Sequence, residues 1–345
     1  MDSLTQIVLG AAVGEATLGK KVGNKALLYG AIAGTIPDMD IIANFFTDTI
    51  TAIELHRGFS HSILFSVLVA PLLGWLVNKI EQKIGLGWKH WAKLFFWGLF
   101  THPLLDAFTT WGTRLFWPFD LRLAFNSIFV IDPFYTAPFL LCTFILLFLR
   151  RDAKIRRRLN IASLVLSTSY LLLTLVIKGI VNQKFENALN AQGIAYLKLS
   201  TRPAPLNTIL WNANIETEED YLIGDYSFFD THPIQFTSYP KYREGSKMML
   251  RYPNVQRLVA ITEGWFIMEQ KQNKWYFYDL RFGLIPQKDG PPFFAFTYVL
   301  ENENGVITAT ENRKTGRDAN YLVQVLWTRI KGERLETTNK QVSPE

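Results

Sequence analysis

Histidine and aspartate residues gather in three short blocks of the N-terminal half of the chain. The blocks read Pro37-Asp38-Met39-Asp40, His56-Arg57-Gly58-Phe59-Ser60-His61-Ser62 and Thr101-His102-Pro103-Leu104-Leu105-Asp106. Each lies within or beside a stretch apolar enough to enter a membrane, where ionisable side chains are costly and mark a functional site by default. Because imidazole and carboxylate groups together suit a divalent metal, the blocks predict a metal site.

The first and third blocks differ in how a helix would present them. His102 and Asp106 are four residues apart, so a helix places both on one face. They can share one metal, or Asp106 can orient His102; a hydrogen-bonded pair that only joins helices is the alternative. Asp38 and Asp40 would diverge on a regular helix, but Pro37 favours local unwinding or a new helix start. Irregular backbone at membrane depth lines a polar site, although an interfacial turn with an aspartate cap remains the alternative.

The middle block needs a bend to bring its histidines together. His56 and His61 are five residues apart, which is poor spacing for one helix face. Ser60 is a good N-cap candidate, which would leave His56 in the loop before the helix and His61 in the first turn. The two converge if Gly58 allows a tight bend. Arg57 either binds an anionic group such as a phosphate or anchors the chain at the membrane interface.

The blocks together indicate hydrolysis. We predict that one or two metal ions bind Asp38, Asp40, His56, His61, His102 and Asp106. Zn²⁺ suits these ligands best, with Mn²⁺ or Fe²⁺ as alternatives. An open coordination position holding water would supply a nucleophile near neutral pH. We assign Asp38, His61 and Arg57 to catalysis, with one carboxylate or imidazole as the general base.

The elements that position these residues are apolar helices. Residues 1–183 of the 345 are dominated by apolar runs, whereas residues 184–345 are polar and mixed. A membrane span needs about 20 mostly apolar residues, and we predict six of them: Leu4–Leu18, Ala26–Phe46, His61–Asn78, Trp91–Trp111, Phe134–Leu149 and Ile161–Val181. The first two are rich in Gly and Ala, which favours close packing. Because Glu15 and the Pro37–Asp40 block interrupt them, four spans after a re-entrant pair is the alternative.

Basic loops indicate how the spans are oriented. Lysine and arginine concentrate in the loops near residues 20–25, 79–93 and 150–158. With six spans these loops share one side, which the positive-inside rule makes cytoplasmic. The N-terminus, the loops at 47–60 and 112–133 and everything after about residue 183 then face outward, and the three blocks gather in the outer half of the membrane.

The C-terminal part is expected to be a mostly β, extracytoplasmic domain. Trp275–Tyr278, Phe293–Val299 and Tyr321–Ile330 have the composition of strands. No ligand-like cluster occurs in this part of the sequence, so it is given no catalytic role. The predicted fold is therefore an α-helical polytopic membrane domain over residues 1–183 followed by a mostly β soluble domain over residues 184–345.

Composition argues against several other classes of protein. The net charge of +6 lies largely in the basic loop at 150–158 and does not indicate a nucleic-acid partner. The single cysteine, Cys142, lies in an apolar run and rules out a disulfide framework. Asp2 and the lack of a basic N-terminal region argue against a cleaved signal peptide. The expected partners are the lipid bilayer and an amphipathic or phosphate-containing substrate.

The blocks resemble those of the YdjM-type family of inner-membrane metal-dependent hydrolases, also described as LexA-binding. The family pattern has Pro-Asp-x-Asp, His-Arg-Gly-Phe-Thr-His-Ser and His-x-x-x-Asp blocks, followed by Thr, Gly and Trp-Pro. Here they are Pro37–Asp40, His56–Ser62 and His102–Asp106, then Thr109, Gly112 and Trp117-Pro118. The resemblance covers about residues 1–135 and implies a membrane-bound metal-dependent hydrolase. Gln6 stands where the family has an early His, and Ile41 where a His often follows, which implies fewer ligands or different neighbours for them.

Two other functions remain open. We expect a phosphoester, such as a phospholipid or lipid-linked phosphate, to be hydrolysed at the outer face. An ion-coupled transporter could use the same polar groups as a pathway, but the sequence shows no inverted repeat and the groups cluster outward. A non-catalytic scaffold that displays the C-terminal domain is the other alternative. LexA binding would need a cytoplasmic surface, whereas the predicted topology places the large domain outside.

Overall fold

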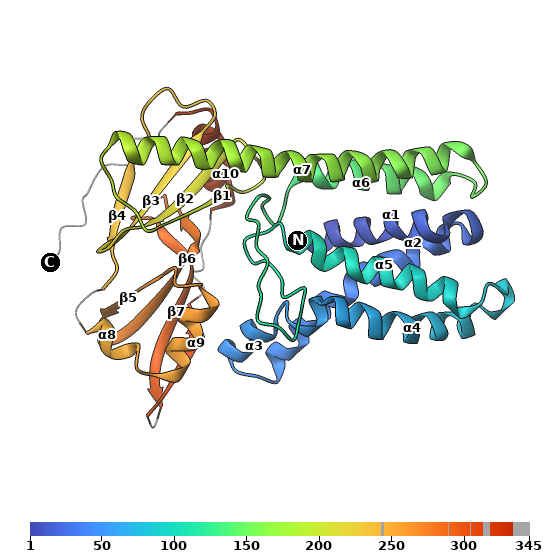
Figure 1. Cartoon of the computed structure of the whole chain (residues 1–345), viewed down its shortest axis with the longest axis horizontal. Coiled ribbons are helices and arrows are strands. Elements are labelled where there is room, and N and C mark those ends of the chain that lie inside the picture. Colours follow the sequence, from blue (N-terminus) through green and yellow to red (C-terminus); the bar gives the residue numbers. More distant parts are fainter. Residues whose placement is uncertain (243–244, 289, 304, 313–317, 334–345) are drawn as a thin grey trace. The chain divides into compact units, whose positions relative to one another are not determined.

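The protein consists of two compact units. The computed structural model describes residues 1–242, 245–288, 290–303, 305–312 and 318–333. One unit comprises Met1–Gly179 with Pro205–Asn207, and the other comprises Ile180–Ala204 with the residues from Thr208 onward. The first unit is helical, and the second is built mainly of antiparallel strands (Figure 1).

Each predicted span overlaps one or two helices, of which α7 runs from the first unit into the second. The elements are α1 (Ser3–Val22), α2 (Asn24–Thr35), the 3-10 helix η1 (Ile36–Phe45), α3 (Thr49–Leu55), the 3-10 helix η2 (Phe59–His61), α4 (Ile63–Ile80), the 3-10 helix η3 (Gln82–Ile84), α5 (Trp88–Asp106), α6 (Pro133–Phe148) and α7 (Lys154–Ala191). Helix α7 continues without a break past residue 183, where the composition of the sequence changes.

Three helical segments among the described residues are long and apolar enough to cross a membrane. They are Asn24–Phe45, Ile63–Ile80 and Lys154–Ala191, while α6 is apolar but has only 16 residues. Apolar side chains such as Leu72 and Leu141 point outward, being 66% and 63% exposed. A lipid environment accounts for such exposed apolar faces. The segments therefore support a membrane protein, although the structure does not confirm the predicted six spans.

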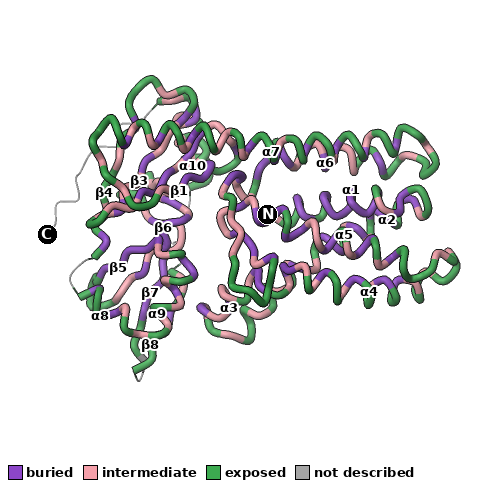
Figure 2. The backbone as a smooth tube through the Cα atoms, viewed as in Figure 1, coloured by how far each residue is buried: buried purple, intermediate pink, exposed green. Residues whose placement is uncertain are grey.

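Helices α1 and α2 pack so closely that only glycine fits between them. A Cβ on Gly10 would lie 2.3 Å from the Gly30 carbonyl oxygen, and one on Gly14 would lie 2.2 Å from that of Ala26. The close packing predicted from the Gly- and Ala-rich composition is thus confirmed. Helix α1 also packs on α5 and α6 and is largely buried (Figure 2). It forms the centre of the helical unit.

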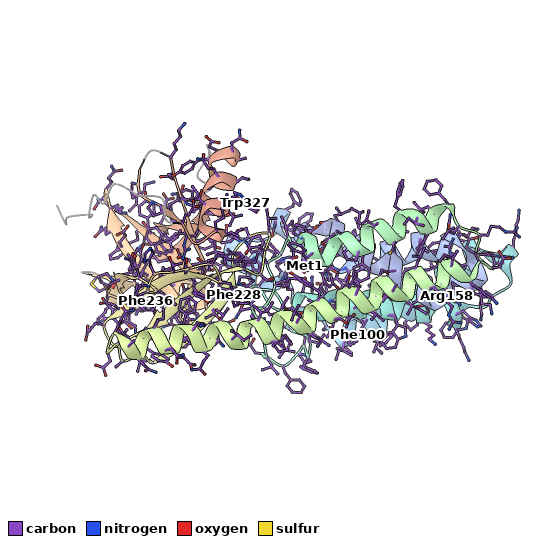
Figure 3. The ribbon with its side chains drawn as sticks, turned by 90° about the horizontal axis from the view of Figure 1, so that it is seen from above. Met1, Phe100, Arg158, Phe228, Phe236 and Trp327 are labelled. Atoms are coloured by element: carbon purple, nitrogen blue, oxygen red, sulfur yellow. The ribbon has the colours of Figure 1, made fainter. Side chains whose placement is uncertain are left out.

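Two of the three basic loops, those near residues 20–25 and 150–158, meet at one end of this unit. Asn24 Nδ2 donates to the Leu147 carbonyl at 2.9 Å, and Arg151 Nη1 donates to the Lys21 carbonyl at 3.3 Å. Met1 and Arg158 lie at opposite ends of the unit (Figure 3). The Asp- and His-containing blocks lie at the Met1 end, because Met1 contacts Asp106 there.

A buried ion pair joins α7 to α1 near the basic end. Arg156, 1% exposed, donates from Nε and Nη2 to the two carboxylate oxygens of Glu15, each at 2.7 Å. Its Nη1 also donates to the carbonyls of Leu146 and Leu149, which end α6. A fully paired arginine can be buried in this way. Glu15, which interrupts the first predicted span, therefore serves helix packing here.

The described residues of the second unit form two four-stranded antiparallel sheets. Their strands are β1 (Lys198–Pro203), β2 (Leu210–Glu216), β3 (Asp220–Ser227) and β4 (Phe236–Pro240), then β5 (Phe266–Lys271), β6 (Lys274–Ile285), β7 (Phe293–Glu303) and β8 (Val306–Glu311). Each sheet keeps the order of the sequence, with registers such as Trp211 opposite Tyr226 and Phe277 opposite Tyr298. The mostly β prediction is confirmed, including strands at Trp275–Tyr278 and Phe293–Val299.

The two sheets share a core and a buried arginine. Tyr221 of β3 packs in one cluster with Ile267 and Leu280 from the other sheet. Arg202 donates from Nη2 to Asn214 Oδ1 at 3.0 Å and to the Leu280 carbonyl at 3.2 Å. Burial lowers the pKa of the Arg202 guanidinium to about 10. This polar contact fixes the two sheets together.

The described residues of the unit also include the end of α7 and three further helices, α8 (Ser246–Met249), α9 (Pro253–Ile261) and α10 (Ala319–Ile330). The prediction of a strand at Tyr321–Ile330 is wrong, because this segment is α10. Asp318 caps the helix by accepting from the Tyr321 N–H at 3.1 Å. Leu326 and Ile330, four residues apart, then pack on the cluster around Leu210. The cap and this spacing outweigh the strand-like composition.

Candidate metal centre

The first block lies in a 3-10 helix that continues from α2. Pro37 ends the regular helix as predicted, and η1 carries Asp38 and Asp40 with a different twist. The two carboxylates reach opposite nitrogens of one ring: Asp38 Oδ1 lies 3.3 Å from His61 Nε2, and Asp40 Oδ2 lies 3.2 Å from His61 Nδ1. The unwound segment therefore places both aspartates around His61.

The middle block bends at Arg57. Its φ of 62° is in the left-handed region, and its N–H donates to Asp40 Oδ2 at 2.9 Å. The bend thus falls one residue before Gly58, where we expected it. A 3-10 turn follows, so Ser62 rather than Ser60 caps α4, accepting from the Phe65 N–H at 3.0 Å. The predictions that Ser60 is the cap and that His61 lies in the first turn are wrong, because the 3-10 turn delays the helix start.

The third block lies at the end of α5, where His102 and Asp106 are buried one turn apart. His102 Nδ1 lies 2.6 Å from the Gly34 carbonyl oxygen. Because a carbonyl only accepts, Nδ1 carries the proton and Nε2 carries the lone pair. Gly34 is at the close contact of α2 with α1, so helix packing sets the tautomer of His102.

One ligand atom from each of four residues forms a compact group, the donor set: Asp38 Oδ1, His61 Nε2, His102 Nε2 and Asp106 Oδ2. All four lie within 4.8 Å of one another. The two Nε2 atoms are 3.2 Å apart, and both are 3.3 Å from Asp38 Oδ1. Their distances to Asp106 Oδ2 are 3.4 and 3.6 Å. Tetrahedral zinc with bonds of about 2.0–2.1 Å separates neighbouring ligand atoms by about 3.3–3.4 Å, close to these values.

The donor set consists of acceptors that face one another. His61 Nδ1 lies 2.9 Å from Ser60 Oγ and 3.2 Å from Asp40 Oδ2, and the Ser60 hydroxyl itself donates to Asp40. With the His61 proton on Nδ1, held by these partners, Nε2 of His61 carries a lone pair, as Nε2 of His102 does. Asp106 Oδ2 has no hydrogen-bond partner among the described residues. A cation among these atoms would satisfy all of them, so the residues fit a metal ion.

The other two predicted ligands lie beside the donor set. Asp40 Oδ1 lies 2.9 Å from His56 Nδ1, and Asp40 Oδ2 accepts from Arg57 N and Ser60 Oγ. The His56 and His61 rings are 5.9 Å apart between centroids. The structure thus brings all six predicted ligands into one network. Asp40 and His56, however, lie beside His61 and not within the donor set.

Arg57 is buried against the donor set. Its Nε lies 3.4 Å from Asp106 Oδ2, and its Nη1 donates to Thr109 Oγ1 at 2.9 Å and to the Gly112 carbonyl at 3.3 Å. Thr109 and Gly112, which follow the third block, therefore hold the guanidinium. Arg57 adds positive charge directly beside the carboxylates.

Some residues of the network were given no role from sequence. Gly34 supplies the acceptor for His102, and the glycine spacing in α1 and α2 was the signal available for it. Gln6 is 1% exposed and contacts Asp106. Outside this network, Asp132 caps α6 and accepts from the Tyr170 hydroxyl at 2.9 Å. Burial raises the pKa of the Asp132 carboxyl.

Comparison with known proteins agrees with the resemblance of the three blocks. The family model described as YdjM inner membrane protein matches residues 1–181, more than half of the chain. The chain is 33% identical over 131 residues to the inner membrane protein YbcI of Escherichia coli (strain K12), covering 35% of this chain and 74% of that protein. No solved structure matches the chain. On the extent of these matches, the chain belongs to the YdjM inner membrane protein family.

Proposed function

We propose that this membrane protein is a metal-dependent hydrolase whose ion is held by Asp38, His61, His102 and Asp106. The observation that carries the proposal is the donor set itself, in which four acceptor atoms converge and no described group donates to Asp106 Oδ2. Two histidines and two carboxylates favour Zn²⁺, with Mn²⁺ or Fe²⁺ as alternatives. When bound, such an ion activates water as a nucleophile near neutral pH.

Members of the donor set are assigned different roles in the proposed reaction. Asp38 is the only member of the donor set with an exposed side chain, at 26%, whereas the side chains of the other three are 0% exposed. Substrate therefore approaches from the side of Asp38. Its described contacts all use Oδ1, so we assign Oδ2 as the general base. We assign His61 to holding the ion, since Asp40 and Ser60 occupy its other nitrogen.

The proposed substrate is an amphipathic phosphoester. Arg57 and the ion together favour an anionic group, for which a guanidinium supplies charge and hydrogen bonds. Apolar side chains in the same segment as Asp38 are exposed, including Met39 at 54% and Ile41 at 57%. An apolar surface beside a cationic site suits a lipid with a phosphate headgroup.

The proposed topology places this site at the outer face. Six spans would put the three basic loops in the cytoplasm and the donor set in the outer half of the membrane. The meeting of the loops around Lys21 and Arg151 at one end of the helical unit supports this arrangement. The unit from Ile180 onward would then be extracytoplasmic.

Elemental analysis of the detergent-purified full chain tests the metal site. We expect about one equivalent of zinc or manganese in the wild type and in His90→Ala, a matched variant of a histidine at the other end of α5. We expect none in His102→Ala, because that substitution removes a ligand from the donor set. Equal metal in both variants, or none in wild type purified without chelator, would reject the site and favour a carrier or a scaffold.

A second measurement tests the reaction. The metal-loaded wild type should hydrolyse a phosphoester presented in mixed micelles, and EDTA should abolish the activity until zinc is restored. Metal that stays bound without any hydrolysis of phosphoesters would contradict the hydrolase proposal while leaving the metal site intact.

A further inference from the structure

We infer that Gln6 is a positioning residue that turns the Asp106 carboxylate so that Oδ2 faces the donor set. This inference rests on the proposed metal site. Gln6 lies on α1, which contributes no member of the donor set, and it is 1% exposed. Its Nε2 donates to Asp106 Oδ1 at 3.0 Å and to the His102 carbonyl at 3.3 Å. The amide thus contacts both donor-set residues of α5.

The orientation of the amide follows from its partners. Asp106 Oδ1 and the His102 carbonyl are both acceptors, so the NH₂ group must face them. The amide oxygen Oε1 is left buried, with no hydrogen-bond partner among the described residues. A buried polar atom without a partner costs about 1–3 kcal/mol. The chain retains this amide at a cost, which is expected where the hydrogen bonds of its NH₂ group serve a function.

Those bonds give the two oxygens of Asp106 different partners. Oδ1 contacts Gln6 Nε2 and the amino group of Met1. Oδ2 has no hydrogen-bond partner among the described residues and lies 3.4 Å from both His61 Nε2 and Arg57 Nε. With Oδ1 held by donors, the carboxylate presents Oδ2 to the cation in one orientation.

The base of the Gln6 side chain is also fixed. A Cβ on Gly34 would lie 2.4 Å from the Gln6 carbonyl oxygen, so the α1 backbone here lies against α2 without space to move. The Gly34 carbonyl orients His102 at the same contact. The contact of α1 with α2 at Gly34 therefore holds two groups that touch the donor set. They are Gln6, which contacts Asp106, and the Gly34 carbonyl, which contacts His102.

The test is the zinc affinity of the full chain in detergent, measured by competition with a chelator. Gln6→Met keeps the length of the side chain but removes the donor. We expect its Kd for zinc to rise about 10–100-fold, the usual effect of losing a group that orients a ligand. Gln6→Asn keeps a buried amide but is one methylene too short, so it should also bind zinc more weakly. It replaces Gln6→Met where that variant does not fold.

Asn160→Leu is the matched control. Asn160 is 2% exposed, its Nδ2 donates to the Ala12 carbonyl at 2.9 Å, and its Oδ1 also lacks a hydrogen-bond partner among the described residues. It joins α7 to α1 away from the donor set. Asn160→Leu should therefore change the thermal stability of the metal-free protein as the Gln6 variants do, but leave the Kd for zinc unchanged.

The outcomes separate this inference from the proposed function. An unchanged Kd in both Gln6 variants, or an equal rise in Asn160→Leu, overturns the positioning role and leaves the metal site standing. A wild type that binds no added zinc overturns both. A raised Kd confined to the Gln6 variants supports the positioning role, even where the wild type hydrolyses no phosphoester.

Discussion

At the scale of single residues, hydrogen bonds outside the donor set decide what its atoms can do. The Gly34 carbonyl accepts from Nδ1 of His102, and Asp40 with Ser60 accepts from that of His61. His102 therefore presents an unprotonated Nε2 to its neighbours, and His61 does the same when its proton is on Nδ1. The same chemical type, aspartate, has two different tasks two residues apart, because Asp38 meets Nε2 of His61 and Asp40 meets Nδ1.

Substituting the two aspartates of the first block should separate these tasks. Asp38→Ala removes a proposed ligand, so zinc should be lost after dialysis. Asp40→Ala leaves the four proposed ligands but removes one of the two acceptors at His61 Nδ1, the other being Ser60 Oγ, so zinc should remain at saturating concentration with a Kd raised about 10–100-fold. Titration of each purified variant with zinc checks this. If Asp40→Ala also lost all zinc at saturation, Asp40 would be a ligand, as the sequence first suggested.

The residue types and spacings predicted all four residues of the donor set, but they did not separate these four from Asp40 and His56. The six predicted ligands are alike in the sequence, since each is an ionisable group in or beside an apolar stretch. They are Asp38, Asp40, His56, His61, His102 and Asp106. What separates them is the direction of each side chain, which depends on the left-handed turn at Arg57 and the 3-10 twist of η1. Gln6 was marked in the sequence only as standing where the family has an early His, and its contact with Asp106 depends on α1 lying against α5.

At the scale of elements, the close contact of α1 with α2 supports the proposed metal centre. Gly34→Ala should therefore affect both stability and metal binding. Its Cβ would lie 2.4 Å from the Gln6 carbonyl oxygen, so backbone must move, at a cost of about 1–3 kcal/mol. Zinc affinity should fall as well, since the Gly34 carbonyl would shift away from His102.

Gly179→Ala is the control for this prediction. Gly179 lies within α7, and a Cβ added there would meet no atom within 4 Å, so alanine should be neutral or stabilising by up to about 1 kcal/mol. Thermal unfolding in detergent and zinc titration of both variants provide the check. Equal stability and equal zinc affinity for Gly34→Ala and wild type would contradict the importance of this contact.

Apolar length and spacing located the helices well, but caps and tertiary packing set their ends. The predicted span at His61–Asn78 is α4 at Ile63–Ile80, because Ser62 is the cap. The span predicted at Ile161–Val181 belongs to a helix of 38 residues, Lys154–Ala191, which begins within the basic loop. The strand predicted at Tyr321–Ile330 is α10, since Asp318 and the packing of Leu326 outweigh the strand-like composition.

At the scale of the whole molecule, the number of membrane crossings decides where the proposed chemistry occurs. Three segments among the described residues have the length and composition of spans. Helix α6 has 16 residues, or about 24 Å at 1.5 Å per residue, which is short for a hydrocarbon core of about 30 Å. Helix α5 has 19 residues but carries Lys89, His90 and Lys93 near its start. The side of the membrane on which the adjoining loops lie therefore decides whether α5 and α6 cross.

Cysteine labelling at four exposed positions separates the possible topologies. With Cys142 replaced by alanine, single cysteines at Lys83, Asp120, Arg150 and Glu218 would be treated with a membrane-impermeant maleimide on intact spheroplasts. Six spans predict labelling of Asp120→Cys and Glu218→Cys from outside, and of Lys83→Cys and Arg150→Cys only after permeabilisation, because basic loops stay in the cytoplasm. If α5 and α6 did not cross, the first three positions would label alike. Labelling of Lys83→Cys but not Glu218→Cys from outside would show that the protein has the opposite orientation, with the donor set on the cytoplasmic side.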